Sequence, residues 1–96
     1  MRRRYVVTYD ICDPRRLRRV FKVLRDWGDH LQLSVFECHL NTMEVIQLKD
    51  AVNAEIHAGE DQVLFIDLGA VDRAQGASVT CLGRPYAPRP DGPVIV

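Results

Sequence analysis

The sequence predicts an α+β protein in which two helices lie against one antiparallel sheet. Apolar residues recur at helical spacing in residues 14–27 and 41–58, and short apolar or alternating runs typical of strands surround these two segments. Glycine and polar residues separate the runs. The predicted order is strand, helix, strand, strand, helix, strand, with one further strand near the C-terminus. This order is that of the ferredoxin-like βαββαβ sandwich with an extra C-terminal strand.

The first strand is predicted in residues 4–11, a run of β-branched and aromatic side chains that suits a buried strand. It ends in a lone carboxylate, Asp10. Asp13 and Pro14 follow, and they are favourable as the N-cap and first residue of a helix. A charge at the end of an apolar strand costs desolvation free energy unless something binds it. Asp10 is therefore a functional candidate; alternatively, it only accepts backbone N–H groups at the turn.

The first helix is predicted from Pro14 to Trp27, with Gly28 as its C-terminal stop. Leu17, Val20, Phe21 and Leu24 recur at the spacing of one apolar face. Six cations lie off that face, and only two acids are nearby. We interpret this basic surface as a phosphate-binding site, with an ordinary solvated helix surface as the alternative. Its residues are Arg15, Arg16, Arg18, Arg19, Lys22 and Arg25.

The parity of the apolar residues flips between Val35 and Phe36. Because side chains of a strand alternate between its two faces, a flip indicates a turn or a bulge. We predict two short strands, 30–33 and 35–40, that meet near Ser34; one long bulged strand is the alternative. The second helix then begins after Asn41, with Glu44 in a capping-box position, and ends near Ala58, with Gly59 as its stop.

The remaining elements are a polar turn at Glu60-Asp61, a strand at 62–68, a loop at 69–77 and a strand at 78–82. Residues 1–83 form the predicted domain. The tail, residues 84–96, holds four of the five prolines and cannot be helical. Its last three residues, 94–96, either add a strand to a sheet edge or are disordered.

The composition fits one small domain of 96 residues, 47% of which are hydrophobic. The net charge is zero, but residues 1–25 carry nine of the 13 basic residues and two acids, a net of +7, which leaves −7 for residues 26–96. This asymmetry favours a basic binding face. The three cysteines fit no zinc spacing and are predicted to be reduced. No apolar run reaches a membrane span and no secretory signal is visible, so we expect a cytoplasmic protein.

Two helices can cover only one face of the predicted sheet. The first and fourth strands are apolar on both sides, so the other face also needs a cover. A second copy of the chain, packed sheet to sheet, would provide it. The sequence therefore predicts a homodimer.

Tyr9-Asp10 at the end of the first strand and Ser34-Val35-Phe36-Glu37 in mid-chain, together with the basic helix and the extended tail, resemble the CRISPR-associated protein 2 family over about residues 4–83. The resemblance implies a metal-dependent endonuclease of RNA or DNA. It also implies a role in spacer acquisition in antiviral defence, in which the dimer bridges copies of the CRISPR-associated integrase. In the family the aspartate that ends the first strand, here Asp10, binds the metal, and the tail pairs with the other subunit's sheet.

One carboxylate per chain is a poor basis for phosphodiester hydrolysis. Two Asp10 side chains that meet across a dimer axis would repel each other, and one Mg²⁺ or Mn²⁺ between them would remove the repulsion and keep several waters, one of them the nucleophile. Four residues are possible accessories: Tyr9, His30, Ser34 and Phe36. His30 stands where similar sequences often carry Arg or Lys. Packing is the favoured interpretation of Tyr9 and Phe36, and stacking of Phe36 on a base is the alternative.

Two functional classes stay open, because fold alone does not select a function. The first is a nuclease that uses a metal at Asp10. The second is a non-catalytic nucleic-acid-binding adaptor that bridges the integrase, which needs the basic helix but not Asp10. A third class, a ferredoxin-like sensor of a small molecule, fits the fold but does not explain the basic helix.

Overall fold

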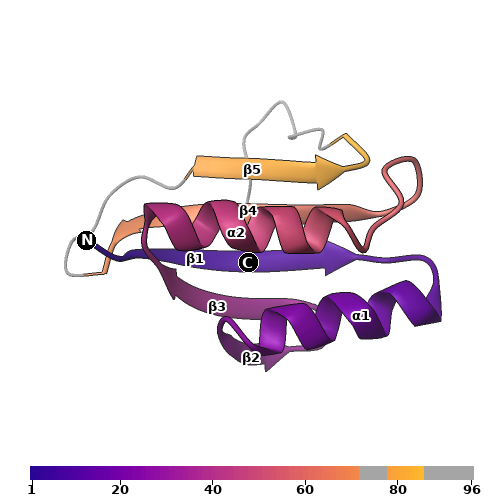
Figure 1. Cartoon of the computed structure of the whole chain (residues 1–96), viewed down its shortest axis with the longest axis horizontal. Helices are drawn as coiled ribbons and strands as arrows, with labels where there is room; N and C mark the ends of the chain where they lie inside the picture. The colour runs from indigo at the N-terminus through magenta and orange to yellow at the C-terminus, as the bar shows by residue number, and fades with distance from the viewer. Residues whose placement is uncertain (72–77, 86–96) are drawn as a thin grey trace, which may run out of the picture.

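A computed structural model describes residues 1–71 and 78–85, and these residues form one antiparallel sheet with two helices (Figure 1). The sheet order is β2-β3-β1-β4-β5, which is the ferredoxin-like order with one added edge strand. This confirms the predicted α+β fold. The elements are β1 (Arg3–Asp10), α1 (Pro14–Arg25), β2 (Asp29–Gln32), β3 (Val35–Leu40), α2 (Thr42–Asn53), β4 (Gln62–Ala70) and β5 (Ser78–Gly83).

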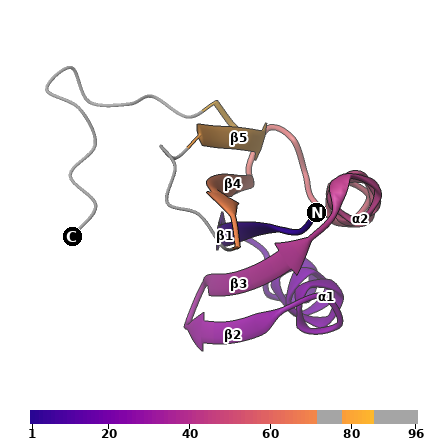
Figure 2. The ribbon, with the colours of Figure 1, turned by 90° about the vertical axis from the view of Figure 1, so that its left-hand side faces the viewer.

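Both helices cover the same face of the sheet (Figure 2). Alternate residues of β1, β3 and β4 point into this layer and meet the apolar stripes of α1 and α2, as the period-two and helical patterns predict. Val20 and Leu24 of α1 are fully buried, whereas Leu17 on the same stripe stays 39% exposed. The largest fully buried side chains of the core are Phe36, Phe65, Leu24, Leu40 and Leu48.

No helix of residues 1–71 and 78–85 lies on the opposite sheet face, which is called the uncovered face below (Figure 2). Its central residues are apolar or short, and each keeps part of its surface exposed: Val6, Thr8, Val35, Leu64 and Ile66. An apolar sheet face without a cover is the feature on which the predicted homodimer depends. The dimer itself stays a prediction, and the predicted pairing of residues 94–96 lies outside the described residues.

The helix starts were predicted correctly, and the helix ends were not. Asp13 caps α1, and Asn41 with Glu44 forms a capping box at α2. However, α1 ends at Arg25, before Gly28. That glycine is required for another reason: a Cβ there would collide with the carbonyl oxygen of Glu37 and the Sγ atom of Cys38 in β3.

The second helix ends at Asn53, five residues before the predicted end. The backbone N–H of His57 donates to the Asp61 carboxylate at 2.8 Å, so it is not available to continue the helix. The predicted polar turn at Glu60-Asp61 is present, because the N–H groups of both residues donate to the His57 carbonyl. The side chain of Asp61, however, is completely buried.

The two-strand interpretation of the mid-chain segment is confirmed. β2 and β3 pair as an antiparallel hairpin whose register shifts between His30 and Gln32. Ser34 lies in the connecting turn, and its carbonyl accepts the N–H of Tyr9 at 3.1 Å. Neither helix in residues 1–71 and 78–85 is long and apolar enough to cross a membrane.

Candidate metal and nucleic-acid site

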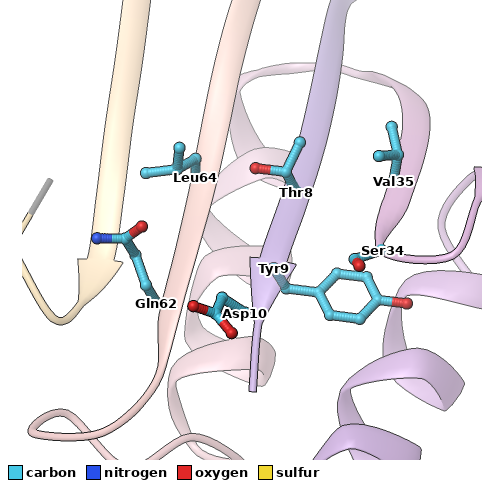
Figure 3. Close-up of a pocket in the computed structure, with 7 residues that line it drawn as sticks. All are labelled: Thr8, Tyr9, Asp10, Ser34, Val35, Gln62 and Leu64. Atoms are coloured by element: carbon cyan, nitrogen blue, oxygen red, sulfur yellow. The ribbon is translucent and has the colours of Figure 1, made fainter. Parts of the chain in front are cut away.

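Asp10 is the last residue of β1, and its carboxylate is exposed at the end of the uncovered sheet face. Strand alternation places it in line with Thr8 and Val6, and it lies opposite Gln62 in the register with β4. Figure 3 shows the carboxylate on the side of Gln62, whereas the ring of Tyr9 points the other way, toward Ser34. The residues around Asp10 enclose a cavity of about 210 Å³.

Arg84, which sequence analysis assigned to the tail, is the ion-pair partner of Asp10. Its Nη2 atom lies 2.7 Å from Oδ2 of Asp10. The arginine is held there by its backbone: its N–H donates to the Asp61 carbonyl at 2.6 Å, and Gln62 Nε2 donates to its carbonyl at 2.9 Å. Gly83 makes this approach possible, because its φ of +89° suits only glycine and a Cβ would strike the Asp61 carbonyl.

The polar residues Thr8, Ser34 and Gln62 line the cavity together with Asp10, and all of them carry oxygen. Mg²⁺ and Mn²⁺ prefer oxygen ligands. Mg²⁺ is commonly held by one or two carboxylates, with waters and substrate phosphates as its other ligands. The Asp10 carboxylate therefore fits such an ion, provided that the Arg84 guanidinium is displaced from it. Within residues 1–71 and 78–85, no three His, Cys, Asp or Glu side chains gather as a ligand cluster. Among the described residues that line this cavity, Asp10 is the one carboxylate.

The four possible accessory residues do not form one cluster around Asp10. Ser34 and Tyr9 line its cavity, but Tyr9 is 6% exposed and its hydroxyl donates to the Leu33 carbonyl at 3.1 Å. Burial raises the pKa of Tyr9, which suits a packing residue. Phe36 is completely buried, so the alternative in which it stacks on a base is wrong. His30 does not line the cavity; its ring packs 4.8 Å from that of Phe36.

Five of the six predicted phosphate-binding residues of α1 are exposed to solvent: Arg15, Arg18, Arg19, Lys22 and Arg25. Arg19 has one distant acidic neighbour, Glu55, at 4.0 Å. No ion pair joins the other four to a carboxylate of the described residues. Their charges are therefore free for a ligand, as a phosphate-binding surface requires.

Arg16 differs from the other five. Its Nε atom donates to Asp61 at 2.7 Å and its Nη2 atom to Glu60 at 3.0 Å, and its side chain is only 21% exposed. Burial raises the pKa of the Asp61 carboxyl, but hydrogen bonds from Arg16 and from the backbone of His57 and Cys12 outweigh this effect and lower the pKa to about 2. Arg16 therefore has a structural role, which corrects its prediction as a phosphate ligand.

The comparisons with known proteins agree with this fold. Residues 1–75 match the family model of the CRISPR associated protein Cas2. A protein of Geobacter sulfurreducens named CRISPR-associated endoribonuclease Cas2 is 39% identical over 88% of this chain and 87% of its own length.

Two solved structures are similar as well. The crystal structure of Streptococcus pyogenes Cas2 matches with a TM-score of 0.61 and 34% identity, over 65% of this chain and 81% of that one. A hypothetical protein of Thermus thermophilus matches with a TM-score of 0.70 and 28% identity, over 81% of this chain and 96% of that one.

Proposed function

Because this chain belongs to the CRISPR-associated protein Cas2 family, we propose that it is an endonuclease of nucleic-acid phosphodiesters. The relative from Geobacter sulfurreducens is named an endoribonuclease, which supports RNA as a substrate. DNA cleavage, a role in spacer acquisition and a partnership with the CRISPR-associated integrase belong to the same proposal. We place this activity in the cytoplasm, where such nucleic acids are found.

The observation that carries the proposal is the exposed carboxylate of Asp10 at the end of an uncovered apolar sheet face. Two copies that pack through this face would cover Val6, Leu64 and Ile66 of both chains. The same packing could bring the two Asp10 side chains together. Paired carboxylates repel each other, and this repulsion favours the capture of a divalent cation.

Asp10 would hold a Mg²⁺ or Mn²⁺ ion through a carboxylate oxygen. The bound ion would supply an activated water and would neutralise charge on the phosphate that is attacked. The cavity around Asp10 opens to solvent at the strand end, which leaves room for a phosphate group. Tyr9 would act by position only, because its hydroxyl already donates to the Leu33 carbonyl.

The exposed cations of α1 would bind the backbone of the substrate. Helix α1 begins four residues after Asp10, so its cations and the carboxylate belong to neighbouring parts of the molecule. A row of guanidinium groups on one helix supplies sequence-independent affinity for phosphates. The carboxylate would then act on a strand that the helix has already bound.

The second candidate function is a non-catalytic adaptor that binds nucleic acid and spaces two copies of the integrase. The Asp10–Arg84 ion pair favours this candidate, because a neutralised carboxylate is a poor metal ligand. Cleavage assays with purified protein distinguish the two. The nuclease proposal predicts cleavage of single-stranded RNA or duplex DNA that stops with a chelator and returns with excess Mg²⁺. Cleavage of neither substrate at any Mg²⁺ concentration would leave the adaptor.

A further inference from the structure

A second cavity, of about 400 Å³, lies between α1 and the turn that joins β2 to β3. Most of its lining residues come from α1, which lies on the other side of the sheet from the face that carries Asp10 (Figure 2). Its volume falls in the range of about 300–1,000 Å³ that is usual for small-ligand sites. Four of its seven lining residues are apolar or aromatic, and three are cations: Tyr9, Leu17, Phe21, Leu33, Arg18, Lys22 and Arg25.

The apolar part of this cavity is unusually open. Leu33 is 91% exposed at the tip of the β2–β3 turn, and Leu17 is 39% exposed on α1. The turn is fixed in this position, because the hydroxyl of Tyr9 donates to the carbonyl of Leu33 at 3.1 Å. This hydrogen bond holds the backbone of Leu33 at the edge of the cavity, and the apolar side chain of Leu33 is available to a ligand.

The aromatic wall is equally fixed. The ring of Phe21 packs edge to face against the rings of His30 and Phe36, with centroid distances of 5.1 Å and 5.5 Å. These contacts hold the Phe21 ring in its position at the cavity. Arg25 lies over the Phe21 ring at 6.0 Å. A planar aromatic ligand can stack on such a ring or on a guanidinium plane.

The charge of the cavity comes from Arg18, Lys22 and Arg25. They recur at spacings of four and three residues along α1, which places them on one side of the helix. None of the three forms an ion pair with a carboxylate of residues 1–71 or 78–85. The apolar lining of the cavity suits a flat apolar group, and the three cations at its rim suit negative groups on either side of it. A ligand with both features would fit this cavity.

We propose that this cavity binds one unpaired nucleobase of a single-stranded nucleic acid, with the flanking phosphates on Arg18, Lys22 and Arg25. The proposal rests on the proposed function in one respect, namely that α1 binds nucleic acid. It goes further by selecting single strands, since the bases of a duplex are stacked on each other and cannot enter. Tyr9 lines both this cavity and the Asp10 cavity, so the two cavities lie on either side of the end of β1.

The test measures binding without cleavage, in the presence of a chelator. The probe is a fluorescein-labelled single-stranded RNA of about ten nucleotides, within the site sizes known for such proteins. A second probe has the same backbone with abasic positions throughout. We expect the abasic probe to bind at least about fivefold more weakly, because stacking is worth that much per base. A duplex of the same sequence should behave like the abasic probe.

The matched variants are Leu33→Glu and Leu31→Glu. Both replace an exposed leucine of the same hairpin and add the same charge, but only Leu33 lines the cavity. Leu33→Glu should weaken the binding of the normal probe at least about fivefold, so that the normal probe no longer binds more tightly than the abasic probe. Leu31→Glu should change the affinity by less than about twofold, since its charge is screened.

The possible contrary results contradict different parts of the proposal. Equal binding of the normal and abasic probes would overturn the nucleobase site and leave the phosphate-binding helix intact. Equal effects of the two variants would overturn the site as well. A competition with an acidic peptide tests for a protein partner. The cavity would be assigned to such a partner if the peptide displaced the normal and abasic probes equally well, and if it displaced them less well from Leu33→Glu than from Leu31→Glu. Absence of binding by both probes would contradict the proposed function itself.

Discussion

Arg84 Nη2 donates to Asp10 Oδ2 at 2.7 Å, across 74 positions of sequence, so the carboxylate proposed as the metal ligand is already neutralised by a side chain of its own chain. The Asp61 carbonyl and the Gln62 amide position the backbone of Arg84. A divalent ion and this guanidinium compete for the same oxygen. Metal binding at Asp10 therefore includes the cost of displacing Arg84.

The Arg84→Ala variant should bind Mn²⁺ more tightly than the wild type. Both side chains of the pair are well exposed, so the gain is modest, about two- to fivefold in Kd. Calorimetric titration of Mn²⁺ measures it. Arg4→Ala is the control, because it removes a cation that is paired with Glu37 and leaves Asp10 unchanged. An equal gain in both variants, or none in Arg84→Ala, would show that Arg84 does not compete with the metal.

Arg16→Ala and Arg18→Ala should have different effects, although the two residues are neighbours on one helix. Arg18 is exposed, so its loss should flatten the slope of log K against log salt for single-stranded RNA by about 0.7. Arg16 is tied to Asp61, so its loss should lower the free energy of unfolding and leave that slope unchanged. Salt titrations and urea unfolding measure the two quantities. A flattened slope in Arg16→Ala would restore it as a phosphate ligand.

Asp61 should make the stability depend on pH in the acid range. Its pKa is about 2 in the folded state against an ordinary value of 3.8, so folding is favoured by about 2 kcal/mol above pH 3.8, and this contribution is lost as the pH falls toward 2. Asp61→Asn lacks this group. The difference in free energy of unfolding between wild type and variant should be largest at pH 6 and should decrease as the pH falls toward 2. A difference that does not change with pH would show that the carboxylate charge is not what stabilises the fold.

Much of the fold was predictable because local patterns encode it. The element order, both N-caps and the β2–β3 hairpin follow from periodicity and capping residues close together in sequence. The helix ends depend on contacts between distant residues, such as the hydrogen bond from His57 to a buried Asp61, and no local pattern reports these.

The site was predictable in part for the same reason. Asp10 stands out because a carboxylate ends an apolar strand. Arg84 and Arg16 could not be assigned, since both depend on contacts across at least 45 positions of sequence. Leu17 gave a misleading signal: it fits the apolar stripe of α1, but it lines an open cavity instead of the core.

The predicted homodimer depends on the uncovered sheet face, and a single charge should disrupt it. Ile66→Glu places a carboxylate in the middle of that face, opposite Val6 of β1. Ile46→Glu is the control, since Ile46 is 51% exposed on α2. Light scattering should give twice the 11.0 kDa chain mass for wild type and Ile46→Glu, and about the chain mass for Ile66→Glu. A monomeric wild type, or a dimeric Ile66→Glu, would contradict packing through this face.

Asp10 is proposed to hold the metal that supports phosphodiester cleavage, and a cleavage assay of Asp10→Asn tests this role most directly. The exchange keeps the shape of the side chain and removes its charge, so fold and oligomeric mass should match the wild type. Single-stranded RNA and duplex DNA are incubated with both proteins, with Mg²⁺, with Mn²⁺ or with chelator. We expect cleavage by the wild type that needs the metal, and none by Asp10→Asn, while RNA binding in chelator stays equal or tightens. Cleavage that persists in Asp10→Asn at the wild-type rate would contradict this role.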